Sequence, residues 1–452
     1  MGMVRRSTLL FGLGLLLAGS LAASAAAAPG TARSQATWVP PVFAPYGRLL
    51  EARAAMRPSS VKRVLQGSWW GGPSTASTGE TVNVFLSDAF PQNESTRATW
   101  VNFFAWLNHG SELPSLTVYV ALLSEVQSFC GPEAAGCYSP AQKILVIPGD
   151  LDQSVNFDIA AHEYGHHIAA SRRNDPWDPN GYGPKRWATY TSVCSRVSAG
   201  TAFPGDEGSH YTLNTGEAFA EAYRALEESR GVYPWAHLPL VVDPSFTPDA
   251  GSEGAALADV QQPWNGPSSA TWEGRFTAPT VKLNAAVGRT VSLETVASVP
   301  VKILARGTYA IAVRDASKQD DFHLTGPGVD RRTGVLGRGQ VNWKLDLKPG
   351  TYRYRSDTHP ALKGSFRVTA AAAAIAVAPI DRTIATGLDG TVQATVSGTA
   401  NATVQVVDPS SGQVLAAPAP GTVSATACGQ RSMVLRVTAK QAGTFHVAIS
   451  AP

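Results

Sequence analysis

The sequence predicts an α+β domain followed by two small all-β sandwich domains. Its 452 residues exceed the length of one ordinary domain, and its 44% hydrophobic content is enough for each part to bury a core. From residue 81 to residue 277, segments with strand alternation and segments with helical apolar spacing follow one another. From about residue 278 the sequence changes to short alternating segments separated by turns, which is typical of β-sandwiches. We therefore expect domains at 81–277, 278–370 and 371–452, the last beginning with an alanine-rich linker.

The N-terminus has the pattern of an export signal at residues 1–28. Arg5 and Arg6 precede the apolar run TLLFGLGLLLAG, and the small residues of SLAASAAAAP supply a cleavage site at the end of this segment. A membrane anchor is the alternative, but the run is short for a span, and no other stretch is long and apolar enough to cross a membrane. We therefore expect a secreted, extracellular protein with no membrane partner after cleavage. Residues 29–80 then form an N-terminal extension or a pro-segment.

Charge and cysteine content argue against a nucleic-acid partner and against a zinc site built from cysteines. The net charge of +3 is too small to indicate a nucleic-acid partner. Export permits disulfides, and Cys130 and Cys137 bracket the loop CGPEAAGC, so we expect them to be bridged. Cys194 and Cys428 either pair across domains or stay free. No two cysteines have C-x-x-C spacing, which argues against a zinc site built from cysteines.

The first domain contains five segments with strand or helix patterns before its last helix. Alternation predicts strands, and apolar spacing of three and four predicts helices. The expected elements are a strand at 81–90, a helix at 93–110 that ends at Gly110, strands at 116–124 and 143–149, a helix at 156–170, and a helix at 213–231 with Asn214 or Thr215 as its N-cap. The middle domain should hold strands at 280–294, 309–316, 340–347, 350–357 and 364–370.

The helix at 156–170 carries the sequence HEYGH, with His162 and His166 four positions apart and Glu163 after the first. On a helix both imidazoles lie on one face and can converge on one metal ion. Zinc lowers the pKa of a bound water, and a glutamate in this position can take its proton as the water attacks a carbonyl. His167 points about 100° away, which favours a packing role. Gly165 inside the helix indicates close approach by another backbone or by a substrate.

The alternative is a pair of hydrogen-bonded core histidines with no metal. If a zinc ion is bound, it needs a third protein ligand and an open fourth position. Downstream candidates are Asp206, Glu207, His210, Glu217 and Glu221. Glu217 is the best of these, near the start of its helix, and Glu221 one turn later is placed to hold a ligand histidine by its free N–H. A solvated helix face is the competing interpretation of these two glutamates, and His210 as the third ligand stays open.

At these residues the sequence resembles the gluzincin zinc metallopeptidases, in which HExxH is followed by a separate helix with a G-E-x-x-A-E pattern. The resemblance implies a zincin-like catalytic domain at 81–277 with one zinc ion and a protein or peptide substrate. It implies that His162, His166 and Glu217 are ligands, that Glu163 is the general base and that Glu221 is the carboxylate behind a ligand.

Two further features belong to this resemblance. The segment FCGPEAAGCYSPAQKILVIPGD is similar to an element of bacterial neutral zinc metallopeptidases, and the strand KILVIP would be the edge strand that pairs with an extended peptide. The loop-borne His or Tyr that steadies the oxyanion has its nearest counterparts in His210 and Tyr211.

The middle domain, in DFHLTGPGVDRRTG and GTYRYRSDTHPALKGSFRV, resembles the cupredoxins. A blue-copper site needs two His, a Cys and usually an axial Met. Here Ser356 stands at the Cys position, Leu362 at the axial position and Asp320 near the first His position, with His323 close by; His359 remains. The resemblance implies a cupredoxin-like sandwich, and without the thiolate we expect no copper.

The function indicated is a secreted zinc metallopeptidase, with the β-domains localising the enzyme or capping its catalytic domain. An extracellular binding or adhesion protein that keeps zinc on a zincin scaffold but cleaves little is the alternative. A zinc hydrolase acting on non-peptide amides is a third interpretation, because fold alone does not identify a substrate. The sequence does not indicate an oligomeric state.

Overall fold

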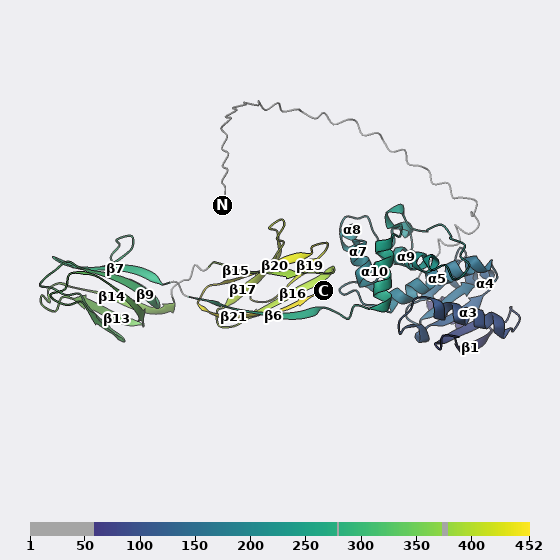
Figure 1. Ribbon diagram of the computed structural model, residues 1–452, viewed down its shortest axis with the longest axis horizontal. Coiled ribbons are helices and arrows are strands. Elements are labelled where there is room, and N and C mark those ends of the chain that lie inside the picture. Colours follow the sequence, from purple (N-terminus) through teal and green to yellow (C-terminus); the bar gives the residue numbers. More distant parts are fainter. Residues whose placement is uncertain (1–57, 278–279, 373–377) are drawn as a thin grey trace, which may run out of the picture. The chain divides into compact units, whose positions relative to one another are not determined.

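The computed structural model describes residues 58–277, 280–372 and 378–452. The expected signal peptide at 1–28 and the first part of the 29–80 segment lie outside the described residues. The predicted order, an α+β part followed by β-sandwich sheets, is confirmed at this level of description (Figure 1). Within the described ranges no helix has both the length and the apolar character needed to span a membrane.

A five-stranded sheet with the order β1-β2-β3-β5-β4 forms the centre of the first domain. Strands β2, β3 and β5 are parallel, whereas β1 is antiparallel to β2 and β4 is antiparallel to β5. The strands are β1 (Trp69–Thr75), β2 (Thr81–Ser87), β3 (Thr117–Ala121), β4 (Cys137–Ser139) and β5 (Ile144–Pro148). The expectation that KILVIP is the edge strand is wrong. The chain after the cysteine loop forms β4 and turns back, so β5 is paired on both sides and β4 is the edge.

Helices cover both faces of this sheet. Val84, Val118 and Leu145 share a core with side chains of α3 and α5, and on the opposite face Tyr119 and Val146 pack with α2 and α4. The helices are α2 (Pro58–Leu65), α3 (Glu94–Trp106), α4 (Leu123–Cys130), α5 (Gln153–Ala170), α6 (Pro179–Tyr182), α7 (Lys185–Tyr190), α8 (Val193–Ser198), α9 (Thr215–Ser229) and α10 (Ala250–Gln261). Short 3-10 helices lie at η2 (Leu113–Ser115), η3 (Tyr211–Leu213) and η4 (Pro244–Phe246).

Residues 58–80 belong to the first domain, which corrects their assignment to an extension or pro-segment. Val61 and Val64 of α2 are buried against the sheet, and β1 pairs with β2 along its whole length. The Gly- and Pro-rich sequence of β1, WWGGPST, has the composition of a loop, but an edge strand tolerates these residues. Removing this segment would uncover one edge of the sheet and the apolar face beneath α2.

The C-terminal sandwich consists of two four-stranded sheets, β15-β20-β17-β18 and β19-β16-β21-β6. Its strands are β6 (Ser268–Phe276), β15 (Ile380–Ala385), β16 (Gly390–Ser397), β17 (Ala402–Val407), β18 (Val414–Ala419), β19 (Gly421–Ala427), β20 (Ser432–Ala439) and β21 (Gly443–Ala451). Strand β6 corrects the boundary expected at 277, because it pairs with β21 over nine residues and lies among the C-terminal strands (Figure 1). Its partner strand comes more than 160 residues later, beyond the reach of any local pattern.

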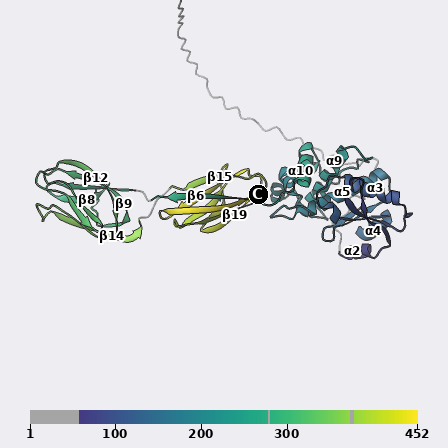
Figure 2. The same cartoon turned by 60° about the horizontal axis from the view of Figure 1, so that its bottom comes forward.

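The middle domain is therefore an insertion between two strands of the C-terminal sandwich. Its strands are β7 (Val281–Val287), β8 (Val291–Thr295), β9 (Ile303–Asp315), β10 (His323–Gly326), β11 (Val329–Arg332), β12 (Gly339–Leu347), β13 (Gly350–Arg355) and β14 (Lys363–Ala372). They follow the order β11-β10-β13-β14-β9-β7-β8, with β12 paired to β9, and enclose one apolar core. Figure 2 labels β8, β9, β12 and β14 of this domain. Each of the five segments expected here contains a strand, but the first, 280–294, covers two strands, β7 and β8, and the turn between them.

Both pairs of cysteines form disulfides. The Cys130–Cys137 bridge is confirmed. Cys194 and Cys428, whose pairing the sequence left open, are bridged with their Cα atoms 5.4 Å apart. This second bridge covalently joins α8 of the first domain to the C-terminal sandwich across 234 residues of sequence.

Candidate metal centre

Helices α5 and α9 bring two histidines and one glutamate to a single buried point. The Nε2 atom of His162 lies 3.2 Å from Oε2 of Glu217, and Nε2 of His166 lies 3.4 Å from Oε1 of the same carboxylate. One ligand atom from each of the three residues falls within 4.8 Å of the others. The three expected ligands are thus brought together, with the geometry of a site for one small cation.

Gly165 makes this convergence possible. A Cβ at this position would lie 2.9 Å from the Cα of Ala220 on α9, closer than real Cβ contacts are found. The two helices therefore cross with their backbones in contact, as the glycine in the sequence indicated. Asn214 starts α9 at the position required, because its side chain accepts a hydrogen bond from Gly216 N at 3.0 Å.

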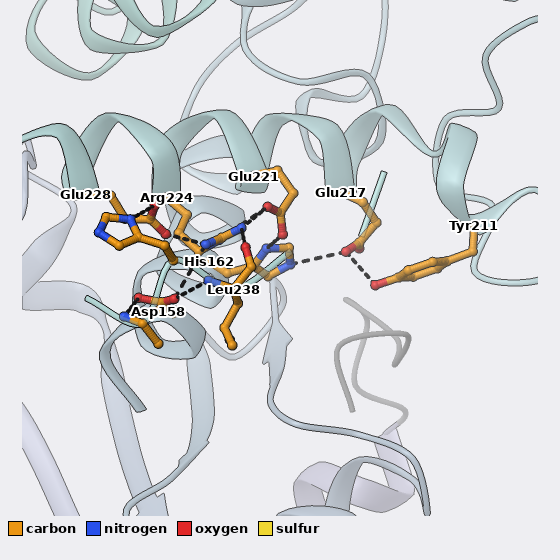
Figure 3. A network of polar contacts seen from close by, with 10 residues as sticks. Asp158, His162, Tyr211, Glu217, Glu221, Arg224, Glu228 and Leu238 are labelled. Atoms are coloured by element: carbon orange, nitrogen blue, oxygen red, sulfur yellow. Dashed lines mark hydrogen bonds and ion pairs between the residues drawn. The ribbon is translucent and has the colours of Figure 1, made fainter. Parts of the chain in front are cut away.

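Behind the histidines lies a buried charged network that the sequence only partly predicted (Figure 3). Oε1 of Glu221 lies 2.9 Å from Nδ1 of His162, and its other oxygen accepts a hydrogen bond from Arg224 at 2.5 Å. Arg224 also pairs with Asp158 at 3.6 Å and with Glu228, and donates to the carbonyl of Leu238. Glu221 thus occupies the position expected of the carboxylate behind a ligand.

The contacts of this network keep Glu221 ionised beside His162. Burial alone raises the pKa of Glu221, but the charge of Arg224 and the hydrogen bond with His162 outweigh burial and hold that pKa at about 2. The carboxylate is therefore a constant acceptor for Nδ1–H, which leaves Nε2 of His162 directed at Glu217. Burial raises the pKa of Asp158 to about 6 despite the charge of Arg224.

The residues present fit a zinc ion. Both ring nitrogens of His166 and Oε1 of Glu217 are buried without a hydrogen-bond partner among the described residues. Such atoms cost about 1–3 kcal/mol each unless something satisfies them. Burial lowers the pKa of His166 to about 4, so its ring is neutral and its Nε2 lone pair is available. Two imidazoles and one carboxylate form a donor set of catalytic zinc sites, whereas hydrogen-bonded core histidines would not leave these atoms unsatisfied.

Glu163 lies beside this cluster under the cysteine loop. A Cβ on Gly136 would be 2.9 Å from both Cγ and Oε1 of Glu163, so the backbone just before β4 rests against this side chain. Its Oε2 atom is buried without a hydrogen-bond partner in the described part of the chain. Burial raises the pKa of Glu163 to about 8.

Tyr211 contacts the ligand cluster directly, whereas His210 contacts Asp206 and Phe203. The Tyr211 hydroxyl donates to Oε2 of Glu217 at 2.7 Å. The ring of His210 stacks on Phe203, and its Nδ1 lies 2.8 Å from Oδ2 of Asp206. The ligand cluster contains Glu217 and not His210, so the alternative in which His210 is the third ligand is not supported. The expected role of His210 beside the oxyanion stays a prediction.

The other candidates have structural partners. His167 bonds Tyr138 through Nδ1 at 2.9 Å and the carbonyl of Glu112 through Nε2 at 3.2 Å, which confirms its packing role. Glu207 accepts a hydrogen bond from Asn214 at 3.1 Å. Sequence reasoning missed Arg224 and Asp158. The available signal was the spacing of three between Glu221 and Arg224, which puts both on one helix face.

In the middle domain the residues at the positions of a copper site form hydrogen bonds with neighbouring polar side chains. The Ser356 hydroxyl donates to Oδ1 of Asp320 at 2.8 Å, and Nδ1 of His359 lies 2.6 Å from the same oxygen. His323 is held by Asp357 and Asp330, each at 2.9 Å. These groups satisfy one another by hydrogen bonds, and Ser356 offers no thiolate.

Comparison with known proteins adds little to this site. No protein-family model and no curated protein matches the chain. Solved structures that match include reduced rusticyanin (15% identity, 22% of this chain and 100% of that chain, TM-score 0.17) and rusticyanin from Thiobacillus ferrooxidans (18%, 21% and 80%, 0.17). Copper nitrite reductase from Nitrosomonas europaea matches at 12% identity over 36% of this chain and 85% of that chain, with a TM-score of 0.16. Likeness this weak supports no functional argument.

Proposed function

We propose that this chain is an exported zinc metallopeptidase whose first domain is zincin-like. One observation carries the proposal: His162, His166 and Glu217 converge on one buried point with Glu221 behind His162 and Glu163 beside it. Each of these side chains would be costly to bury alone, and each has a role around a zinc ion. The two disulfides are compatible with an extracellular location.

The residues around the cluster would have separate roles in peptide hydrolysis. A zinc ion held here would acidify a coordinated water and polarise a substrate carbonyl. Glu221 fixes the ring of His162 through Nδ1–H, and Tyr211 holds one oxygen of Glu217. Glu163, kept as a carboxylate beside a cation, takes the proton of the attacking water and returns it to the leaving amine.

The surroundings of Glu163 favour a peptide as the substrate. The backbone at Gly136 touches Glu163, and β4 follows directly at Cys137. In the described residues β4 pairs with one strand only, so its outer edge is the place where an extended peptide could add to the sheet. A peptide paired there would run past the proposed general base.

Cleavage of an unfolded protein by the purified mature chain tests this proposal. We expect cleavage that is lost on chelation, restored by zinc and absent in Glu163→Gln, which removes only the base. Glu273→Gln, on an exposed side chain of β6, is the matched control and should cleave like wild type. Stoichiometric zinc without cleavage in the wild-type chain would contradict the enzyme and favour the binding protein on a zincin scaffold.

A further inference from the structure

The middle domain has a charge unlike that of the rest of the chain. Residues 280–372 contain 15 Lys and Arg against seven Asp and Glu, a net charge of +8, whereas the whole chain carries only +3. All 15 cationic side chains are exposed. Of the seven acids, only Asp330 and Asp346 are exposed, because the others are buried or half-buried. The charged side chains on the surface of this domain are therefore predominantly positive.

Many of these cations gather at one end of the sandwich. The strand register places Arg332, His323, Arg355 and Lys363 in one row across β11, β10, β13 and β14. Asp357 partly neutralises this row, because it contacts Arg332, Arg355 and His323.

The turns beside this row add cations that are not neutralised. Arg289, Lys318 and Arg338 form no ion pair with any described residue. Two of them lie in turns at the same end, since Ala316 N bonds the carbonyl of Val287 and so joins the β7–β8 turn to the end of β9.

The same end carries an exposed apolar turn. In the loop 333–338 between β11 and β12, Gly337 N bonds the carbonyl of Gly334, which places Val335 and Leu336 at the two central positions of the turn. Such positions usually hold Gly, Asn, Asp or Ser. Leu336 is 86% exposed, the highest value among the exposed large hydrophobic side chains, and Val335 is 39% exposed.

This turn lies far from the connections to the rest of the chain. Ala372, at the exit of the domain, pairs with Arg306 near the start of β9, whereas Gly339, just after the turn, pairs with Asp315 at the end of β9. Arg306 and Asp315 are nine positions apart, which corresponds to ~30 Å along the strand. The tip is therefore the end of the domain that its own linkers leave accessible.

A pocket of about 250 Å³ lies at the base of the turn. Arg332 and Arg338 line it from either side of the turn, together with Trp343 and the buried Asp315. Two arginines in the lining of a small pocket suit a phosphate, which arginine can bind with two parallel hydrogen bonds.

We propose that the middle domain docks this tip on an anionic phospholipid bilayer. Val335 and Leu336 enter the region between head groups and acyl chains, while Arg332 and Arg338 contact head-group phosphates. The exposed Leu336 favours a bilayer over a linear polyanion such as polyphosphate. A hydrophilic polymer offers an apolar side chain nothing to bury against, whereas a bilayer interface does.

This inference does not depend on the proposed peptidase activity. It replaces the expectation that the mature chain has no membrane partner, since a peripheral contact needs no spanning segment. It also gives the middle domain a role in localisation, which the low net charge of the whole chain concealed.

Co-sedimentation of the purified chain with lipid vesicles tests the proposal. We expect binding to vesicles of phosphatidylcholine and phosphatidylglycerol (about 70:30), much weaker binding to pure phosphatidylcholine, and weakening with salt. Arg332→Gln with Arg338→Gln should lower the affinity by about 25-fold, at roughly fivefold per cation. Val335→Ser with Leu336→Ser should also weaken binding.

A matched control is available at the opposite end of the same domain. Val296 and Val299 are 65% and 56% exposed, and changing both to Ser should leave vesicle binding unaltered. Equal binding to neutral and anionic vesicles would overturn the proposal. So would soluble polyphosphate binding that displaces the vesicles and is unaffected by Val335→Ser with Leu336→Ser, which would identify a linear polyanion. Salt-sensitive self-association of the chain, without vesicle binding, would instead identify a second copy as the partner.

Discussion

Gly165→Ala tests whether the close crossing of α5 and α9 forms the metal centre. The added Cβ would lie 2.9 Å from the Cα of Ala220, and neither backbone can give way without moving a helix. Gly254→Ala in α10 is the matched control, because a Cβ there meets nothing within 4 Å. Both substitutions gain ~1 kcal/mol of helix propensity, whereas only the first overpacks the core, at a cost of about 1–3 kcal/mol.

We therefore expect Gly165→Ala to be less stable than Gly254→Ala by about 1–3 kcal/mol in urea unfolding of the metal-free chain. Zinc affinity, measured by competition with a chromophoric chelator, should fall in Gly165→Ala and remain unchanged in Gly254→Ala. A shift of α5 against α9 separates His166 from Glu217, which are on different helices. Equal stability and equal zinc affinity of the two variants would refute the reasoning.

Three further predictions follow from buried or hydrogen-bonded groups. Arg224→Leu leaves Glu221 buried without its cation and should cost about 3–5 kcal/mol in urea unfolding; a loss below 1 kcal/mol would contradict the network. Tyr211→Phe removes the donor to Glu217 and should weaken zinc binding without unfolding the domain, as seen by chelator competition and circular dichroism. Burial lowers the pKa of His323, but hydrogen bonds to two carboxylates outweigh it and raise that pKa above 6.5. The stabilisation by His323 should be complete below about pH 6.5 and disappear as the pH rises through the raised pKa, so His323→Gln should destabilise at pH 5.5 and not at pH 9.

The parts of the site that the sequence predicted are those controlled by helix geometry. A spacing of four puts His162 and His166 on one face of any helix, and the same rule puts Glu217 and Glu221 on one face of the next. The pairing of the two helices could be inferred only through the family resemblance, and Gly165 was its one local sign. Asp158 escaped notice because its partners come from α9 and the segment at Leu238, about 70–80 residues away.

The fold predictions failed where pairing is long-range. Only Trp272, Gly274 and Phe276 of β6 alternate with exposed residues, and nothing near β6 in the sequence indicates that its partner is β21. Strand β1 looks like a loop because its Gly and Pro are unusual in a strand, and its hairpin with β2 overrides that composition. The sequence did not predict β4, because a strand of three residues leaves no periodic pattern. Without β4, the edge of the sheet was assigned to β5.

X-ray absorption at the zinc K-edge of the zinc-loaded chain tests the central claim most directly. We expect one zinc ion per chain, with two imidazole nitrogens at about 2.0–2.1 Å and a carboxylate oxygen at about 2.0–2.2 Å. Glu217→Ala should lose stoichiometric zinc. Three imidazoles in the first coordination sphere, with zinc fully retained by Glu217→Ala, would contradict the assignment of Glu217 and place His210 at the metal.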